Sequence, residues 1–329
     1  MKRAVIAGAT GVVGTALTER LLQEKIEVLI LARKDSKRLK VIPVHPLVTV
    51  IHAGMEDYAE LKNTTDRCWD VFYNLAWGGT FGEARNDTEI QIKNISYTLD
   101  AVKLAKRLGC HTFVGVGSQA EYGRYEGKLN AGIPAFPENG YGMAKLCAGQ
   151  MSRLLCRELG MRHIWARILS VYGPGDGEKT MVMSALNSFF QGKAPEFTAG
   201  EQQWDYLYNK DAARALYLMG EKGIDGRVYC LGSGRVKPLR DYIVQIRDAV
   251  LETERKSLSD VSKQETVEKA EKLLSGIGKL PYTPNQVMYL CADIAQLTED
   301  TGFEPEYSFA EGISETAEWM KKGYLRKQP

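Results

Sequence analysis

The sequence has few of the patterns that mark metal-binding, disulfide-linked or membrane proteins. Its six cysteines include no Cys-x-x-Cys pair, and its four histidines stand at no ligand spacing to them, so we expect reduced, buried thiols and no metal site. No apolar run is long enough to cross a bilayer, and a strand pattern begins at the second residue, where a secretory signal peptide would stand. These absences predict a cytoplasmic protein with no membrane partner.

A strong charge of either sign is also missing. The chain has 43 lysines and arginines against 41 acidic residues, which leaves a net charge of +2 over 329 residues. Such a balance provides no field that would hold nucleic acid, so a small molecule is the expected partner. The length is sufficient for two lobes, and no internal repeat or low-complexity tract interrupts it.

The first 14 residues join a short apolar strand, at 4–7, to a glycine-rich turn and then to a helical pattern. Gly8 permits a tight turn, Gly11 lets a pyrophosphate approach the backbone, and Gly14 lets the helix lie close to the strand. The N–H groups at the start of that helix are suited to bind phosphate. The residues predicted to hold the phosphates of a dinucleotide are Gly8, Thr10, Gly11, Val12, Val13 and Gly14.

Apolar runs and helical periods alternate through the first half of the chain in the order of βαβ units. Strands are predicted at 28–31, 48–52, 71–75, 112–116 and 163–169, and helices at 58–62, 89–108 and 141–159. Parallel strands joined by helices form one sheet that is covered on both faces. The pattern therefore predicts an α/β fold with a Rossmann-type, doubly wound parallel sheet.

This alternation ends after residue 169, where the segments become shorter and more varied. Helices are predicted near 178–191, 211–220 and 309–320, strands at 228–231 and 287–290, and one or two exposed helices in the charged run 252–272. We assign residues 1–169 to a dinucleotide-binding domain that also receives 208–232 and 287–295. The remainder of 170–329 is expected to form a smaller mixed α/β lobe that binds the substrate.

Three polar residues of the first domain are suited to move a proton at a carbonyl group. Ser118 follows a predicted strand, at the sheet edge where such folds bind ligands. Tyr141 and Lys145 are four residues apart, which places them on one face of a helix. A nearby ammonium favours the phenolate and lowers the pKa of the tyrosine. Tyr141 would then exchange a proton with an oxygen held by Ser118, beside a nicotinamide that exchanges the hydride.

With these motifs the chain resembles the extended short-chain dehydrogenase/reductases, and among them the nucleotide-sugar epimerases, dehydratases and reductases. The matching positions are 8–14, Asn74-Leu75-Ala76, Asn94, 118–123, Tyr141 with Lys145, Arg167 with 171–175, 204–206 with Asp211, 292–294 with Leu297, and Gly302-Phe303 with Pro305. The resemblance implies that Ser118, Tyr141 and Lys145 are catalytic. It also implies cofactor contacts from Leu75, Ala76, Tyr141 and Lys145, and contacts to a nucleotide-diphosphate sugar from Trp77, Gln119, Ser170 and Trp204.

Three positions depart from the family pattern. Ser170 stands where the family usually has asparagine, and Trp204 stands where it usually has arginine, and both usual residues help to hold the nucleotide diphosphate. A tryptophan there would either stack on a base or sugar or pack in the lobe junction. Gln119 and Ala120 stand where dehydratases of the group carry aspartate and glutamate. Neither side chain supplies the acid or the base that elimination of water needs.

The end of the second predicted strand carries cations where an NAD site needs a carboxylate. Ala32 is followed by Arg33 and Lys34, and a guanidinium is the natural partner of a 2′-phosphate. This position favours NADP, with Arg33 and Lys34 as ligands. Asp35 as a ribose ligand would instead indicate NAD, and a solvated basic loop with no ligand is the third interpretation.

The first functional hypothesis is an NADP-dependent reductase of a nucleotide-linked 4-keto sugar. The nearest alternative is a nucleotide-sugar epimerase, which usually keeps NAD bound, or a dehydratase of the same group. A catalytically silent NADP sensor or interaction module is the alternative of another class. A homodimer is also expected, because helices 89–108 and 141–159 are apolar beyond the need of one sheet face and form a four-helix bundle in the family.

Overall fold

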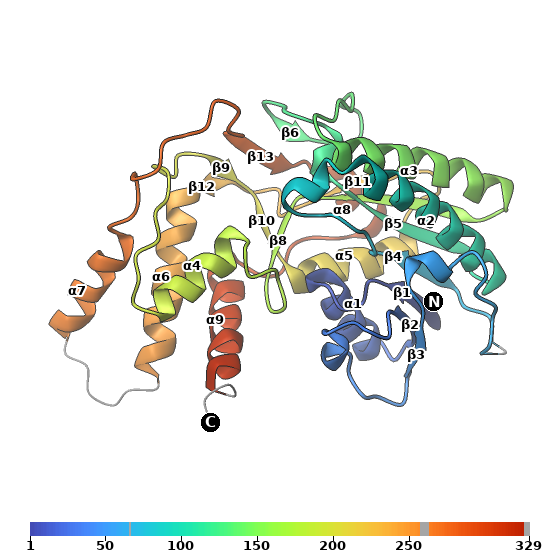
Figure 1. Ribbon diagram of the computed structural model, residues 1–329, viewed down its shortest axis with the longest axis horizontal. Coiled ribbons are helices and arrows are strands. Elements are labelled where there is room, and N and C mark those ends of the chain that lie inside the picture. The colour runs from blue at the N-terminus through green and yellow to red at the C-terminus, as the bar shows by residue number, and fades with distance from the viewer. Residues whose placement is uncertain (66, 257–262, 326–329) are drawn as a thin grey trace.

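Seven parallel strands form the large sheet of the computed structural model, which describes residues 1–65, 67–256 and 263–325. The strands lie in the order β11-β7-β5-β4-β1-β2-β3, and every neighbouring pair is parallel (Figure 1). They are β1 (Arg3–Ala7), β2 (Glu27–Ala32), β3 (Val48–His52), β4 (Val71–Asn74), β5 (Thr112–Ser118), β7 (Arg162–Ile168) and β11 (Val228–Leu231). The predicted Rossmann-type sheet is confirmed.

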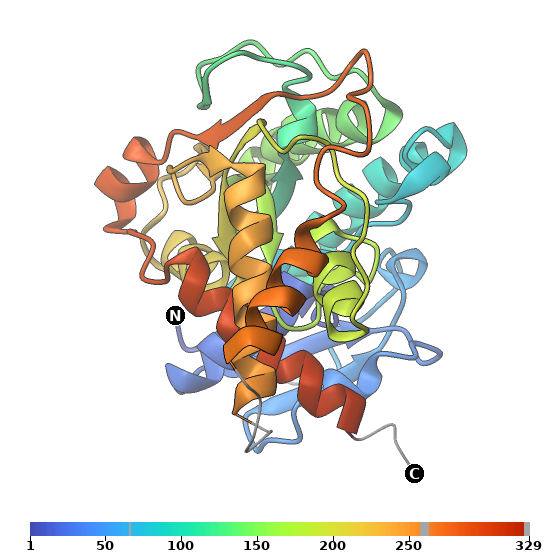
Figure 2. The same cartoon turned by 90° about the vertical axis from the view of Figure 1, so that its left-hand side faces the viewer.

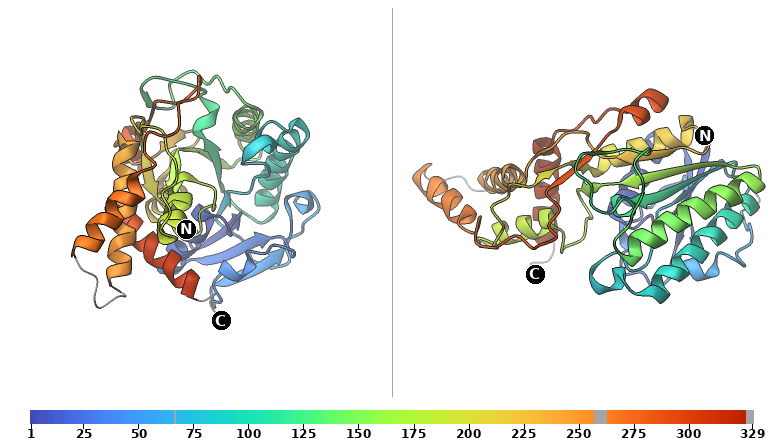
Figure 3. Two further views of the ribbon diagram at one scale, coloured as in Figure 1. Left: turned by 60° about the vertical axis from the view of Figure 1, so that its left-hand side comes forward. Right: turned by 90° about the horizontal axis from the view of Figure 1, so that it is seen from above.

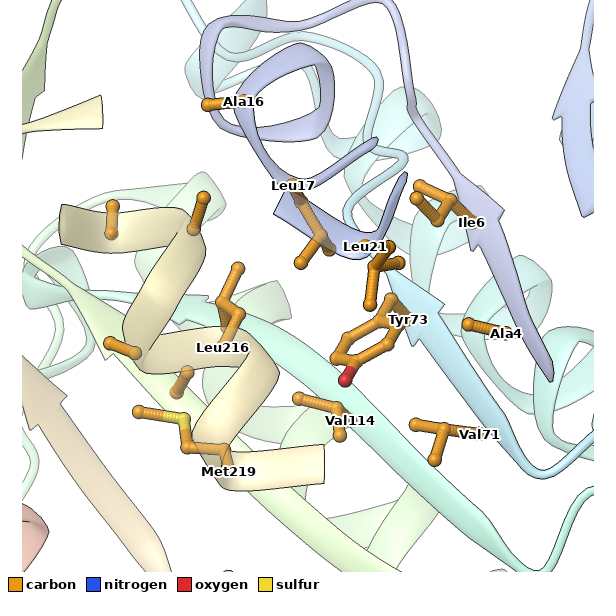
Figure 4. Packing of buried hydrophobic residues seen from close by; sticks show 14 of the residues in the cluster. Ala4, Ile6, Ala16, Leu17, Leu21, Val71, Tyr73, Val114, Leu216 and Met219 are labelled. Carbon is orange, nitrogen blue, oxygen red and sulfur yellow. The ribbon is translucent and has the colours of Figure 1, made fainter. Parts of the chain in front are cut away.

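Helices cover both faces of this sheet. α1 (Val12–Gln23) packs with α5 (Asn209–Lys222) on one face, and α2 (Thr88–Arg107) lies beside α3 (Gly140–Glu158) on the other (Figure 3). On the first face, Leu17 and Leu21 of α1 and Leu216 of α5 surround the ring of Tyr73 (Figure 4). Because both faces are covered, a ligand can approach the sheet at the carboxyl ends of the strands.

The second lobe combines helices with two small sheets. α4 (Met181–Phe190), α6 (Leu239–Arg255) and α9 (Phe309–Leu325) share a separate apolar cluster, and α7 (Lys263–Leu274) packs on α6 (Figure 2). The four-stranded sheet has the order β12-β9-β13-β6, and the two-stranded sheet pairs β10 with β8. Their bounds are β6 (Lys128–Leu129), β8 (Ser170–Tyr172), β9 (Gln203–Trp204), β10 (Tyr206–Tyr208), β12 (Lys237–Pro238) and β13 (Tyr289–Ala292), and α8 (Ala295–Thr301) follows β13. We propose that the division near residue 169 separates two functional lobes.

The predicted helix at 58–62 is wrong. A 3-10 turn, η2 (Met55–Asp57), precedes it, and residues 58–60 form a hydrogen-bonded turn that does not continue as a helix. The Arg107 guanidinium at the end of α2 donates to the carbonyls of Tyr58 and Leu61, so a side chain takes the place of helical N–H donors. A contact between segments far apart in the sequence thus overrides the local apolar pattern.

The segments expected from 252 onward also differ in detail. The strand predicted at 287–290 is β13, which pairs with β6 and β9 in the small sheet, whereas β11 joins the large sheet. Residues 287–295 therefore do not extend the large sheet. The charged run contains the end of α6 and most of α7, and Thr253 of α6 within this run is buried, so these helices are not exposed throughout. Leu258 and Val261 lie outside the described residues.

Two smaller expectations concern the cysteines and membrane spans. All six cysteines are free, and four are buried, but Cys68 and Cys147 are exposed because they lie at the surface of a loop and of α3. Burial was thus predicted wrongly for these two. Within the described ranges, the structure contains no helix of the length and apolarity that a membrane crossing requires.

Candidate active site

The turn after β1 leaves an opening at the start of α1 that suits a phosphate. Gly8 has a φ of +88°, and a Cβ there would lie 2.8 Å from the Ala76 backbone nitrogen. A Cβ on Gly14 would lie 2.2 Å from the Gly8 carbonyl oxygen, so packing of the protein itself requires both glycines. A Cβ on Gly11 would meet no described atom closer than 3.6 Å, and no side chain caps α1 at this residue. The uncapped N–H groups and the open side of Gly11 fit a dinucleotide pyrophosphate.

Ser118, Tyr141 and Lys145 come together at the carboxyl end of β5. Ser118 ends this strand, and the other two residues lie in the first two turns of α3. The Ser118 hydroxyl lies near enough to Tyr141 to act on its pKa, and Lys145 Nζ donates to the Val116 carbonyl oxygen at 2.6 Å. α3 approaches this closely because Gly142 has no Cβ, which would lie 2.2 Å from the backbone of the turn after β5. The structure therefore places the three predicted catalytic side chains in one site.

Burial is the main influence on the ionisation of the two α3 residues. It raises the pKa of Tyr141 from its ordinary value, while the Ser118 hydroxyl and the positive charge of Arg85 act to lower that pKa. Burial lowers the pKa of Lys145 to about 7, and the negative charge of Glu121 opposes this shift. The prediction that Lys145 brings the pKa of Tyr141 down is therefore wrong for this structure. The cation closest to the phenol ring is Arg85, whose Cζ lies 4.5 Å from the ring centroid, against 5.9 Å for Lys145 Nζ.

Trp77 forms a wall of the site beside these residues. Lys145 Nζ lies 3.8 Å from the centroid of the indole, and Trp77 meets the Tyr141 ring edge-on at a centroid distance of 6.2 Å. The indole N–H donates to Gln91 Oε1 of α2, and Asn94 of α2 holds the backbone of the next residue in both directions. Two buried amides of α2 thus fix the loop after β4, and Trp77 packs on Lys145.

The basic residues after β2 lie beside the glycine turn, because β2 pairs with β1 in parallel register. Arg33 is exposed, and its Nε lies 3.9 Å from an Asp35 carboxylate oxygen. Arg38 instead reaches the second lobe, where it donates to the Gly175 carbonyl oxygen at 2.5 Å. The remaining residues predicted at the cofactor are Lys34 in this loop, Thr10, Val12 and Val13 around the start of α1, and Leu75 and Ala76 after β4. All of them follow the carboxyl ends of β1, β2 or β4.

Comparison with known proteins identifies the family. The model of the NAD-dependent epimerase/dehydratase family matches residues 4–232, which include the glycine turn and the three residues of the site. The chain belongs to this family. The resemblance to the extended short-chain dehydrogenase/reductases of nucleotide sugars is confirmed at that level.

Individual members of the family are similar over different lengths. A dTDP-glucose 4,6-dehydratase of Shigella flexneri is 25% identical over 202 residues, which are 59% of this chain and 52% of the relative, so the match spans about half of that enzyme. A UDP-N-acetylglucosamine 4-epimerase from Methanobrevibacter ruminantium M1, solved with UDP-N-acetylmuramic acid, has a TM-score of 0.80 at 21% identity and covers 98% and 99% of the two chains. RMD from Pseudomonas aeruginosa, complexed with NADPH, has a TM-score of 0.76 at 19% identity and covers 98% and 100%. These structures share the fold of this family member.

Two departures from the family pattern contact each other. The indole N–H of Trp204 in β9 donates to Ser170 Oγ in β8 at 2.9 Å, and the Trp204 carbonyl accepts from the Tyr242 hydroxyl at 2.9 Å. The residue pair is 34 positions apart in sequence, so no local pattern could show the contact. Trp204 is partly buried and packs in the lobe junction, and its polar atom is already occupied. An indole cannot supply the positive charge that the usual arginine provides at this position.

The third departure concerns the turn η4 (Gln119–Glu121). The side chain of Gln119 is partly exposed, whereas Glu121 is fully buried. Glu121 Oε1 accepts the Ser118 N–H at 2.8 Å and the Trp165 indole N–H at 3.0 Å, and Oε2 accepts Arg167 Nε at 2.6 Å. Both oxygens are therefore engaged by donors of the protein itself. Glu121 cannot replace the dehydratase carboxylates that Gln119 and Ala120 lack.

Sequence reasoning missed two charged residues next to the site. Arg85 ends the turn η3 (Gly82–Arg85) between β4 and α2, and no motif distinguishes it from other surface arginines. Glu121 stands inside the matched segment 118–123, where a carboxylate in a stretch of small and apolar residues was a usable signal for a buried pair. Its partner Arg167 lies 46 residues later in the sequence, so only the parallel pairing of β5 with β7 reveals the contact.

Proposed function

We propose that this protein is an NADP-dependent reductase that acts on the 4-keto group of a nucleotide-linked sugar. The observation that carries the proposal is the convergence of Ser118, Tyr141 and Lys145 at the sheet edge that also holds the glycine turn. A nicotinamide supplies the hydride when it is bound there. Ser118 orients the carbonyl oxygen by a hydrogen bond, and Tyr141 gives that oxygen its proton. Lys145 remains inside the site and donates to the backbone of β5, which holds it near the same phenol.

The acid and base required for dehydration are missing in the part of the chain that the structure describes around Ser118. Gln119 and Ala120 carry no acidic group, and Glu121 is committed to Ser118, Trp165 and Arg167. Elimination of water needs one group to give a proton and another to take one. A reaction that requires only one proton and one hydride is therefore favoured over the activity named for the curated relatives.

The experiment that tests this function counts oxidised cofactor. The full chain is incubated with NADPH and each of a panel of 4-keto and 4-hydroxy sugars linked to UDP, CDP, GDP or dTDP. A reductase releases one NADP⁺ for each keto sugar consumed. An epimerase, the activity named for the Methanobrevibacter ruminantium neighbour, interconverts 4-hydroxy epimers with no net change in cofactor. Binding of cofactor without turnover of any member of the panel would instead indicate a sensor or interaction module.

Arg33→Ala tests the cofactor assignment. We propose that Arg33 and Lys34 pair with the 2′-phosphate of NADP, since Arg33 is exposed after β2 and only distantly paired with Asp35. Loss of a charged hydrogen bond of roughly 1.5–3 kcal/mol corresponds to a rise of about 10- to 150-fold in the Kd for NADPH. Calorimetric titration should show no more than about a twofold change for NADH. Arg67→Ala, at an arginine that pairs with Glu27 at the opposite end of β2, should leave both affinities unchanged. Equal weakening of NADH and NADPH by Arg33→Ala would refute the assignment.

We also propose a homodimer through α2 and α3. These helices expose Ile92, Met143, Met151 and Leu154 on the face away from the sheet. Exposed apolar side chains grouped on two adjacent helices are typical of a subunit interface. Static light scattering at micromolar concentration should give twice the mass of the chain, and a monomer would contradict the proposal.

A further inference from the structure

Arg85 is a cation that faces the candidate catalytic phenol without a counter-ion. Its Cζ lies 4.5 Å from the centroid of the Tyr141 ring. The guanidinium donates one long hydrogen bond, from Nη1 to the Thr80 carbonyl oxygen at 3.4 Å. Across the described ranges, no carboxylate oxygen comes within 4.0 Å of this guanidinium. Its charge is therefore directed at the aromatic ring and not neutralised by an acidic neighbour.

The loop around Arg85 is held on both sides. Gln91 Nε2 of α2 donates to the carbonyls of Gly79 and Ala84, at 3.0 and 2.9 Å. On the other side, Asn86 Oδ1 accepts the Gly140 N–H at the start of α3, at 3.0 Å. The residues before and after Arg85 are thus fixed to the two helices that frame the site. These contacts fix the backbone from which the guanidinium reaches over the ring.

We propose that Arg85 is a positioning residue that stabilises the anionic form of Tyr141 when the phenol gives up its proton. The proposal rests on the assignment of Tyr141 as proton donor in the proposed function. A cation over an aromatic face is attracted by the ring even when the phenol is neutral. The attraction increases once the ring carries a full negative charge in a site of low dielectric. Lys145 contributes less to this interaction, because it is farther from the ring and donates to Val116.

Four polar groups face Tyr141 from the surrounding elements. They are Arg85 from η3, Ser118 from β5, Glu121 from η4 and Lys145 from α3. Arg85 and the Ser118 hydroxyl favour the phenolate and lower the pKa of Tyr141, and Glu121 disfavours it and raises this pKa. Burial and Glu121 raise the pKa of Tyr141, and removal of the Arg85 charge takes away one of the two groups that lower it. The phenolate therefore becomes harder to form. The midpoint of phenol ionisation must then move to higher pH.

The test follows the ionisation of Tyr141 directly and needs no substrate. The full chain is prepared with ¹³Cζ-labelled tyrosine, and the Tyr141 resonance is identified by its absence in Tyr141→Phe. Arg85→Gln should move the midpoint of its titration upward by about one pH unit, which corresponds to a tenfold lower ionised fraction at a fixed pH below it. Arg85→Lys, which keeps the charge, should restore most of the shift. Arg85→Met is also neutral but can pack on the ring. It should raise the midpoint by the same amount and replaces Arg85→Gln if glutamine disturbs the loop.

A matched control removes an arginine that lies over another tyrosine ring, far from the site. Arg20 of α1 lies over the Tyr217 ring of α5 with its Cζ 5.3 Å from the centroid, on the opposite face of the sheet. Arg20→Gln should leave the Tyr141 midpoint unchanged. An unaltered midpoint in both Arg85→Gln and Arg85→Met would overturn the proposal, even if these variants bound substrate less well. Because the titration is independent of turnover, this failure is distinct from failure of the cofactor-counting experiment.

Discussion

Tyr141→Phe is expected to lower the rate of carbonyl reduction by about 10³-fold, within the range of roughly 10²- to 10⁴-fold that a positioned acid contributes. The substitution removes only the phenol hydroxyl, whose ionisation Ser118 and Arg85 favour. Phenylalanine keeps the edge-on contact with Trp77 and the ring surface beneath Arg85. The fold and the glycine turn should therefore remain as they are, and any loss of affinity for the cofactor should be small beside the loss of rate. The measurement is the single-turnover rate at saturating NADPH, together with the Kd for NADPH.

Tyr229→Phe is the control for the loss of a tyrosine hydroxyl. Tyr229 lies on β11, and its hydroxyl donates to Asp300 Oδ2 at 2.8 Å, away from the carboxyl edge of β5. Its removal should reduce stability by about 1 kcal/mol and leave the rate unchanged. If Tyr141→Phe kept more than a tenth of the wild-type rate, another group would have to be the proton donor, and the proposed reaction would need a different acid.

The elements that the sequence predicts well are those whose cause is local. The strand, glycine turn and helix at the N-terminus follow one another without interruption, and the two long helices have an apolar period that a glycine ends. The Ser118, Tyr141 and Lys145 site is also predictable, since each residue has a fixed place at a strand end or on one helical face. The helix at 58–62 fails because Arg107, about 50 residues later, binds the carbonyls concerned.

Glycines near the site illustrate what local patterns cannot show. A Cβ on Gly115 or Gly117 of β5 would lie 2.3 Å from an atom of the Trp165 side chain, and a Cβ on Gly149 of α3 would lie 2.7 Å from it. These glycines make room for the indole that donates to Glu121. In the sequence they resemble ordinary interruptions of a strand and a helix. The need for glycine at these positions becomes visible only when β5, β7 and α3 are packed together.

The same packing makes Glu121→Gln the substitution with the largest expected effect on stability. Glu121 is fully buried, and Arg167 is almost fully buried at a distance of 2.6 Å. Glutamine would retain an acceptor for Ser118 and Trp165 but leave the guanidinium without a counter-ion. Removal of one partner from a buried ion pair costs about 3–5 kcal/mol, so the urea midpoint should fall markedly. Glu138→Gln, in the exposed pair with Arg124, should cost less than about 1 kcal/mol.

A double variant separates the ion pair from the packing around it. Glu121→Gln with Arg167→Met removes both charges, and an uncharged replacement of a buried pair is often neutral or stabilising. We therefore expect the double variant to recover most of the stability that Glu121→Gln loses, with a coupling free energy of about 2–3 kcal/mol in the mutant cycle. If the single variant unfolded at the same urea concentration as Glu138→Gln, the pair would not support the turn that carries Ser118. A double variant that is stable yet reduces its substrate slowly would show that the pair serves the position of Ser118, because Glu121 is the acceptor of that residue's N–H.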